Sequence, residues 1–268
     1  MNLASKRALI TGAGQGLGRE IAFGLARAGV EVIVTDINAA ALKETEQKLH
    51  EAGFKAHAYP LDVTQSDQIA EARRRIVSEI GPIDVLVNNA GLVFGGEFTS
   101  VSLERHRKTI DVNLTGLISL THAFLPDLMA RPEAAIVNIA SASAVVPLPW
   151  AATYAATKAA VLSFSESLRE ELRLLGKRHL LVSAICPSFI STGLFEGAKP
   201  ARLTWMLTPE KVAKAVVRSI KRNRTFLMLP WTASLLYVVG RCLPIGLYRR
   251  ICALLGVSTS MRGWRGHG

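Results

Sequence analysis

The chain has 268 residues and a mass of 28.9 kDa, a length that suits one α/β domain. Apolar residues make up 49% and charged residues 20%, which excludes a disordered chain, a collagen-like repeat and a disulfide-rich scaffold. Its three cysteines show no CxxC spacing, so neither a disulfide framework nor a zinc site is indicated. The N-terminal residues lack an apolar stretch with a cleavage signal, and no window reaches about 18 consecutive apolar residues. A secretory peptide and a membrane-spanning helix are therefore not expected, and the cytoplasm is the predicted compartment.

The formal net charge of +11 is unevenly distributed along the chain. Residues 1–198 hold 19 Lys and Arg against 20 Asp and Glu, whereas residues 199–268 hold 13 against one acid, Glu210. A general nucleic-acid-binding surface would not leave the first three quarters of the chain neutral, so we predict no nucleic-acid partner. The basic C-terminal region is either a solvated tail or an element that faces anionic lipid or an acidic partner.

Short apolar runs alternate with longer amphipathic stretches along most of the chain. The runs predict strands at 8–11, 31–36, 56–61, 85–88, 135–140, 181–186 and 226–229. The stretches between them predict helices at 16–28, 39–52, 66–80, 103–129 and 153–175. This alternation predicts right-handed βαβ units and therefore a single doubly wound parallel sheet with helices on both faces, the Rossmann fold. Ligands of such sheets bind beyond the carboxyl ends of the strands.

A glycine-rich segment, TGAGQGLG at residues 11–18, lies between the first predicted strand and the first predicted helix. Glycines there allow a tight turn and the close approach of a pyrophosphate, whose charge meets the N–H groups and the dipole of the helix start. The glycine spacing alone is weak evidence, but the flanking strand and helix supply the context that the motif requires. The alternative is a packing turn without a ligand.

An acidic residue follows the glycine segment at the expected distance. Asp36 ends the second predicted strand, twenty residues after Gly16, where a carboxylate can accept hydrogen bonds from the adenosine ribose hydroxyls. The same carboxylate would repel a 2′-phosphate, and neither Gln15 nor Ile37 supplies a cation. NAD rather than NADP is therefore the predicted cofactor.

A tyrosine and a lysine lie one helical turn apart at the start of the fifth predicted helix. The spacing of Tyr154 and Lys158 puts both side chains on one face. A lysine ammonium and an oxidised nicotinamide ring nearby would both favour the phenolate and lower the tyrosine pKa toward neutral pH. Ser141, at the end of the fifth predicted strand, could hold a substrate oxygen while Tyr154 moves the proton. Ser143 is close enough to share that role.

Together these motifs resemble the short-chain dehydrogenase/reductase family. The resemblance covers residues 5–230 and includes the glycine segment, the Asp62-Val63 pair, the Asn-Asn-Ala-Gly run at 88–91, Asn113, Ser141, the Tyr154/Lys158 pair and the Pro-Ser-Phe-Ile-Ser-Thr run at 187–192. The family usually has glycine where this chain has Ser188, which weakens the placement of the residues just after it. The C-terminal residues 226–268 further resemble the retinol and hydroxysteroid dehydrogenase branch.

The resemblance implies roles for individual residues. Ser141 would orient the substrate oxygen, Tyr154 would be the acid/base, Lys158 would tune it and bind the nicotinamide ribose, and Asn113 would anchor a proton-relay water. The implied cofactor-binding residues are Gly12, Gln15, Gly16, Leu17, Gly18, Asp36, Asp62, Val63, Asn89, Ala90, Gly91, Tyr154, Lys158, Ile190 and Thr192. The family's reaction is hydride transfer between a substrate carbon and the nicotinamide, accompanied by proton transfer through the tyrosine.

The segments expected to select the substrate, 93–100, 144–153 and 193–207, are rich in Val, Leu, Pro, Trp and Phe. A lipophilic alcohol or carbonyl compound of steroid, retinoid or long-chain type is therefore the predicted substrate, with Ser141, Val145, Tyr154 and Leu194 as its contacts. A homo-oligomer is the expected assembly. The six histidines show no ligand spacing, so no metal is predicted. A dinucleotide-binding sensor or scaffold without turnover is the alternative function.

We predict an NAD-binding catalytic domain over residues 1–230 and a basic amphipathic extension over 231–268, packed on that domain or continuous with it. The extension has no acid, and Pro244 separates two short helical segments. Apolar residues recur on one face of each segment, at 235, 239, 242 and 243 and at 247, 251, 254 and 255, with Arg249 and Arg250 opposite the second set. Such stripes suit either the interface of an anionic membrane or packing on a substrate lid or a subunit.

Overall fold

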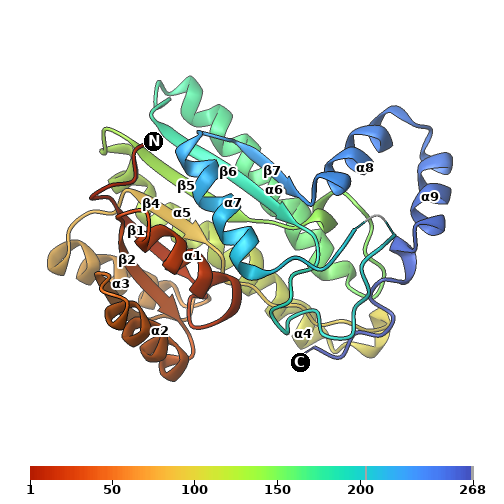
Figure 1. Ribbon diagram of the computed structural model, residues 1–268, viewed down its shortest axis with the longest axis horizontal. Helices are drawn as coiled ribbons and strands as arrows, with labels where there is room; N and C mark the ends of the chain where they lie inside the picture. The colour runs from red at the N-terminus through yellow and green to blue at the C-terminus, as the bar shows by residue number, and fades with distance from the viewer. Residues whose placement is uncertain (203, 267–268) are drawn as a thin grey trace.

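The computed structural model describes residues 1–202 and 204–266 of the chain (Figure 1). One of the six histidines considered above, His267, lies outside these residues. Two features position the functional site: a parallel sheet whose strands end at one edge, and a C-terminal segment that returns to that edge.

Within the described residues, seven strands form one parallel sheet in the order β3-β2-β1-β4-β5-β6-β7. They are β1 (Arg7–Thr11), β2 (Glu31–Asp36), β3 (Ala56–Pro60), β4 (Val85–Asn88), β5 (Ala134–Ile139), β6 (Leu180–Pro187) and β7 (Phe226–Leu229). The order reverses between β1 and β4, the neighbours on either side of the point where ligands bind in doubly wound sheets. The predicted doubly wound fold is thereby confirmed.

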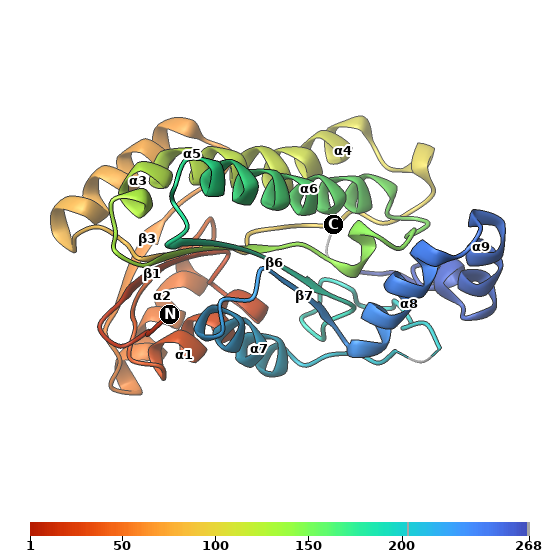
Figure 2. The same ribbon diagram turned by 90° about the horizontal axis from the view of Figure 1, so that it is seen from above.

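Helices cover both faces of the sheet, as Figure 2 shows from above. One face carries α1 (Gly16–Ala26), α2 (Ala39–Glu51) and α7 (Pro209–Lys221). The other carries α3 (Ser66–Glu79), α4 (Leu103–Ile110), α5 (Gly116–Met129) and α6 (Ala152–Leu174). Alternate strand residues pack against the two layers: Val32 and Val34 face the α1 side, whereas Ile33 between them faces the α3 side. Because both faces are covered, the strands are almost continuously apolar.

Two helical features differ from the sequence-based expectation. The single helix expected over 103–129 is divided into α4 and α5 by a π-helical turn, Asp111–Thr115, which contains Asn113. A π-turn adds one residue to the helix and changes the direction in which its side chains point, which the apolar periodicity does not reveal. Helix α7 was not predicted, although Thr208 caps it through Lys211 N and Pro209 occupies its first turn, both ordinary start signals.

The C-terminal extension forms α8 (Trp231–Cys242), α9 (Ile245–Leu254) and the short 3₁₀ helix Val257–Thr259. Figures 1 and 2 show α8 and α9 projecting from one end of the molecule, beyond the carboxyl end of β7. The chain then returns to the main body, where Met261 is buried and Trp264 Nε1 donates to the carbonyl of Leu194 at 3.0 Å. No helix in the described ranges is long and apolar enough to cross a bilayer.

Candidate active site

A cavity of about 450 Å³ runs along the carboxyl ends of the central strands. All fifteen residues predicted to bind the cofactor line it: Gly12, Gln15, Gly16, Leu17, Gly18, Asp36, Asp62, Val63, Asn89, Ala90, Gly91, Tyr154, Lys158, Ile190 and Thr192. They come from the ends of five strands and from α1 and α6, so only the folded sheet brings them together. We call this cavity the dinucleotide cavity.

The glycines of the 11–18 segment are required by close contacts. A Cβ at Gly18 would lie 2.1 Å from the carbonyl oxygen of Gly12, which no side chain can relieve. Gly12 and Gly16 adopt φ values of +62° and +54°, in the left-handed region that favours glycine. A Cβ at Gly16 would also project to 3.2 Å from Thr192 Cβ. The segment therefore passes close to its neighbours without side chains and leaves its backbone open toward the cavity.

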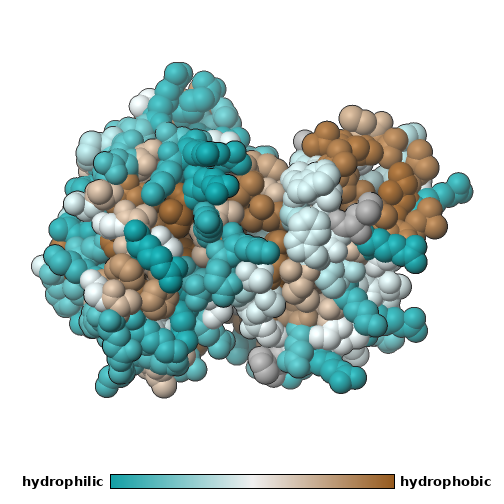
Figure 3. Space-filling view, viewed as in Figure 1, coloured by the Kyte–Doolittle hydropathy of each residue, from teal (hydrophilic) through white to brown (hydrophobic). Residues whose placement is uncertain are grey.

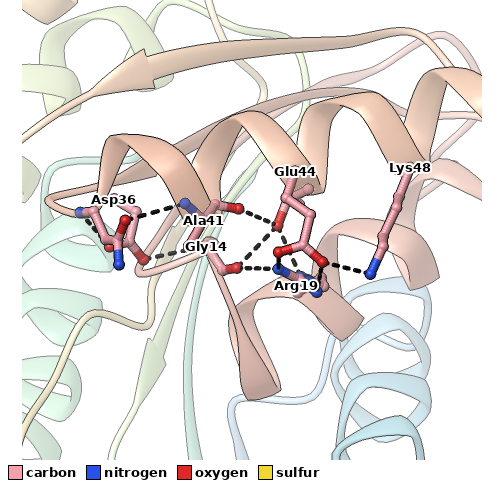
Figure 4. Close-up of polar contacts among 8 residues, drawn as sticks. Gly14, Arg19, Asp36, Ala41, Glu44 and Lys48 are labelled. Atoms are coloured by element: carbon pink, nitrogen blue, oxygen red, sulfur yellow. Dashed lines mark hydrogen bonds and ion pairs between the residues drawn. The ribbon is translucent and has the colours of Figure 1, made fainter.

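Asp36 is held rigidly at the end of β2 (Figure 4). Its Oδ2 accepts a hydrogen bond from Gly14 N at 2.9 Å, and its Oδ1 accepts one from Asn38 N at 2.9 Å. The nearby guanidinium of Arg19 donates to the carbonyl of Gly14 at 2.6 Å and forms an ion pair with Glu44 at 3.2 Å. Glu44 also binds Lys48. The two cations of this network are thus paired with Glu44, and a fixed carboxylate occupies the end of β2.

Asn89 fastens the end of β4 to the glycine segment. Its Nδ2 donates to the carbonyls of Thr11 at 2.9 Å and Gly12 at 3.1 Å. In return, the Thr11 hydroxyl accepts hydrogen bonds from the backbone N–H groups of Asn89 and Ala90, both at 3.0 Å. These four bonds set the floor of the dinucleotide cavity between β1 and β4.

Ser141, Tyr154 and Lys158 meet at the carboxyl end of β5. All three are buried, and the Ser141 hydroxyl is close enough to the Tyr154 phenol to favour its ionised form. Lys158 Nζ donates to the carbonyl of Ile139 at 2.8 Å and lies 5.7 Å from the centroid of the Tyr154 ring. Helix α6 is fixed in register against the sheet by Asn138 of β5, whose Nδ2 donates to Ser165 Oγ at 2.8 Å. The tyrosine and lysine therefore have defined positions relative to the end of β5.

Burial dominates the ionisation of this group. It raises the pKa of Tyr154 to about 12, although the nearby Ser141 hydroxyl acts to lower it. It lowers the pKa of Lys158 to about 8, because the charged ammonium loses its hydration. The expected lowering of the tyrosine pKa is therefore not produced by Lys158 alone. Near neutral pH the phenol carries its proton and can act as a donor.

Asn113 lies behind this group, in the π-helical turn. Its Oδ1 accepts from Leu92 N at 2.8 Å, and its Nδ2 donates to the Leu92 carbonyl at 2.9 Å and to Thr157 Oγ1 at 3.2 Å. All the hydrogen-bonding atoms of its side chain thus join the segment after β4 to α6. Asn113 does not line either of the cavities described here, and its predicted contact with a relay water stays a prediction.

A second cavity, of about 600 Å³, opens from Ser141 toward α8 and has almost entirely apolar walls. Its described lining includes Val146, Leu148, Phe189, Leu236 and Val257. Ser188 and Phe195 line both cavities, so the two spaces meet there. Phe195 packs edge-on against the Tyr154 ring, with the centroids 5.7 Å apart. Ser141, which lines this second cavity, and Tyr154, which lines the dinucleotide cavity, therefore lie where the two spaces meet. We call the second space the apolar cavity.

Two predicted substrate contacts lie elsewhere. Val145 lines a recess between α6 and α8 instead of the apolar cavity, because the 3₁₀ helix Ala142–Ala144 directs its neighbour Val146 into the cavity. Leu194 lines the dinucleotide cavity. Ser143, the alternative to Ser141, lines the apolar cavity and donates its backbone N–H to Ser141 Oγ at 3.1 Å.

Sequence reasoning missed several residues of the site. Cys186 is fully buried next to Ser141 and Tyr154, and burial raises the pKa of its thiol to about 12, so it is neutral and not a nucleophile. Met261 and Trp264 belong to the same apolar cluster as Tyr154 and Phe195. Cys186 could have been found from its position at the end of a predicted strand. The return of the C-terminal segment has no signal in the sequence.

The fold and this arrangement define a dehydrogenase-type dinucleotide site, and sequence comparison identifies the class. Residues 6–202 match the short chain dehydrogenase family, to which the chain belongs. It is an oxidoreductase of that family.

Two relatives place it more closely. The chain is 32% identical to estradiol 17-beta-dehydrogenase 11 of Mus musculus over 243 residues, which cover 91% of this chain and 81% of the relative. It is 32% identical to epidermal retinol dehydrogenase 2 of Mus musculus over 268 residues, covering 99% and 87%. The predicted resemblance to the retinol and hydroxysteroid dehydrogenase branch is confirmed.

Solved structures agree with the fold and differ in their cofactors. A short chain dehydrogenase/reductase from Burkholderia phymatum in complex with NAD superposes with a TM-score of 0.81 at 25% identity, covering 97% of this chain and 98% of that one. A gluconate 5-dehydrogenase from Burkholderia cenocepacia in complex with NADP and tartrate gives 0.76 at 25% identity, covering 84% and 94%. The fold thus binds a nicotinamide dinucleotide, and both kinds occur among similar structures.

The lowered pKa of Lys158 predicts a specific dependence of stability on pH. In the unfolded chain a lysine keeps its proton up to about pH 10.5, whereas the folded protein releases it near pH 8. Between these values unfolding takes up a proton, so the penalty for burying the charge is relieved as the pH rises. Relative to Lys158→Met, the wild-type protein should gain roughly 2 kcal/mol of unfolding free energy from pH 7 to pH 9.5.

Denaturant unfolding of both proteins without cofactor measures this difference. Lys214→Met, which removes an exposed lysine on α7, is the control for the loss of one charge. A constant difference between wild type and Lys158→Met across the pH range would contradict the assigned ionisation.

Proposed function

We propose that this protein is an NAD-dependent dehydrogenase that interconverts a lipophilic secondary alcohol, or a long-chain alcohol, and its carbonyl compound. The observation that carries the proposal is the position of Ser141 and Tyr154 at the junction of the dinucleotide cavity and the apolar cavity. Hydride transfer requires the donor and acceptor carbons to be in contact. At this junction a substrate carbon in the apolar cavity would face a nicotinamide in the dinucleotide cavity.

The residues of the dinucleotide cavity fit a bound nicotinamide dinucleotide. The glycine segment supplies the first backbone N–H groups of α1, which have no partner within the helix and suit a pyrophosphate. Asp36, held by Gly14 and Asn38, still has lone pairs for the ribose hydroxyls and would repel a 2′-phosphate. The nearby cation Arg19 is paired with Glu44 and hydrogen-bonded to Gly14. These contacts favour NAD over NADP.

When bound, the dinucleotide supplies the hydride acceptor or donor. The protein's own residues bind the substrate oxygen and transfer its proton. The Ser141 hydroxyl donates to the substrate oxygen and orients it toward Tyr154. In the direction of carbonyl reduction, Tyr154 gives the proton from its Oη to that oxygen, and its raised pKa keeps the proton in place until then. In the direction of alcohol oxidation, Tyr154 must accept the proton, which the nearby charge of Lys158 favours.

The walls of the apolar cavity support a lipophilic substrate. Its volume of about 600 Å³ is within the range of roughly 300–1,000 Å³ that small-molecule sites occupy. Among its described lining residues, the one charged side chain is Arg202, which is exposed at the edge. A panel of steroid, retinoid and long-chain alcohols with NAD, followed by NADH absorbance, tests the proposal. Absence of NADH formation with every member, in a protein that binds NAD, would contradict it and favour a sensor without turnover.

Replacement of Tyr154 by phenylalanine should abolish turnover. The phenyl ring retains the packing against Phe195 but removes the oxygen that carries the proton, for which losses of about 10²-fold to 10⁴-fold are typical. Binding of NAD, measured by calorimetry, should remain. Tyr59→Phe is the matched control, because it removes a phenol oxygen that binds Glu79 outside the site. A Tyr154→Phe protein with a near-wild-type rate would show that the proton takes another route.

Replacement of Asp36 by alanine should reduce the preference for NAD over NADP. The change removes the acceptor for the ribose hydroxyls and the charge that opposes a 2′-phosphate, so the ratio of kcat/KM values should fall at least about tenfold, or 1.4 kcal/mol. Asp67→Ala, an exposed site on α3, controls for the loss of one negative charge. Equal use of both cofactors by the unmodified enzyme would refute the assignment of NAD.

A further inference from the structure

The C-terminal lobe exposes a patch of large apolar side chains. Seven of them lie on α8 and α9: Trp231, Leu235, Val238, Val239, Ile245, Leu247 and Leu254, of which Trp231 is 67% and Leu254 76% exposed. The buried face of α9 is formed by other residues, Tyr248 and Cys252. Figure 3 shows the patch as brown side chains over α8 and α9, beside teal side chains of the same lobe. We call it the α8–α9 surface.

This surface is continuous with the mouth of the apolar cavity. Trp231, Leu235 and Val239 are exposed, and all three also line the cavity, as does the exposed Trp205. An apolar path therefore runs from the outer face of α8 to Ser141 at the far end of the cavity. Part of the apolar stripe predicted on the sequence thus faces the cavity mouth and solvent together.

The charged side chains of the α8–α9 surface itself are basic, and an exposed acid beside it, Glu166 of α6, lines the recess next to Ile245. Residues 211–268 contain no Asp or Glu, and Arg249 and Arg250 are exposed on α9, with Arg202 at the edge of the cavity. A face-to-face contact between two copies would bring the arginines of α9 close to those of the other copy. A flat anionic layer with an apolar interior complements both the arginines and the exposed side chains between them.

We propose that the α8–α9 surface docks on an anionic membrane, and that the lipophilic substrate enters the apolar cavity directly from the lipid. The helices are too short to span a bilayer, so they lie in its interface with the apolar side chains below the headgroups. The docking step is independent of catalysis, whereas delivery of substrate rests on the proposed function. If the mouth of the apolar cavity lies against the membrane, a lipophilic substrate can enter it without passing through water.

Flotation of the full-length protein with lipid vesicles tests the docking step. We expect binding to vesicles of phosphatidylcholine and phosphatidylglycerol, and much weaker binding to phosphatidylcholine alone. Raising the salt from 0.1 M to 1 M, which shortens the Debye length from about 10 Å to about 3 Å, should release the protein. Arg249→Glu with Arg250→Glu should weaken binding at least about 30-fold, because each cation near an anionic surface contributes a factor of about five.

Matched variants separate a local surface from the overall charge. Arg222→Glu with Arg224→Glu changes the net charge equally, but these exposed residues lie between α7 and β7, at the opposite edge of the sheet from α8. Leu247→Gln with Leu254→Gln should weaken binding, whereas Leu174→Gln with Leu175→Gln, an exposed pair after β5 and before β6, should not. Wild-type protein that never floats, or equal loss in both arginine pairs, would overturn the proposal.

Size-exclusion chromatography tests whether a second copy of the chain, instead of a membrane, covers the α8–α9 surface. Homo-oligomerisation stays a prediction, and dissociation of an oligomer by the Leu247→Gln, Leu254→Gln pair would assign the surface to a second copy and overturn membrane docking.

Kinetics test delivery. With a long-chain alcohol embedded in anionic vesicles, the Leu247→Gln, Leu254→Gln variant should lower the rate of NAD reduction about as much as it lowers binding to the vesicles. The rate with a short water-soluble alcohol should stay unchanged, because neither leucine lines the apolar cavity. Equal rates for wild type and variant with the embedded substrate would refute delivery from the lipid. Absence of turnover with every alcohol would refute the proposed function, and flotation would still decide the docking.

Discussion

The parallel alignment of seven strands is the constraint on which the site depends. In a parallel sheet all strands run in the same direction. The carboxyl ends of the paired strands therefore reach the same edge of the sheet, and these strands include β1, β2, β4, β5 and β6. The glycine segment, Asp36, Asn89, Ser141 and Ile190 follow those ends and therefore line adjoining cavities. The order reversal between β1 and β4 separates the helices there and leaves room for the dinucleotide.

Burial supplies the chemistry at this edge at a cost in stability. Tyr154 and Lys158 are enclosed by apolar neighbours, which keep the phenol protonated and make the ammonium easier to deprotonate. The charge of Lys158 is partly stabilised by the Ile139 carbonyl, since no carboxylate is hydrogen-bonded to it among the described contacts. A cation without a paired acid is available to influence the phenol and a ribose. Part of the folding free energy is thus given up to keep two titratable groups in a working arrangement.

The C-terminal lobe connects the site to the surroundings of the molecule. Met261 and Trp264 pack in the same cluster as Tyr154, and α8 forms part of the wall of the apolar cavity, so one segment both closes the active site and carries the exposed apolar surface. This dual position explains why its apolar periodicity fits two interpretations of the sequence: the same helix has a cavity side and an outer side. It also means that removing the segment would disturb the site, so point variants are the better test of its surface.

The sequence by itself determined the doubly wound fold, with helices on both faces of the sheet, and the residues of the dinucleotide cavity. These features depend on local periodicity and on motifs at strand ends. The tertiary structure decided what depends on contacts distant in the chain. The π-turn at Asn113, the choice of Val146 over Val145 and the packing of Met261 and Trp264 near Tyr154 leave no periodic signal. The pKa of Tyr154 also belongs to this group, because the desolvation that raises it comes from side chains on several elements that meet only in the folded chain.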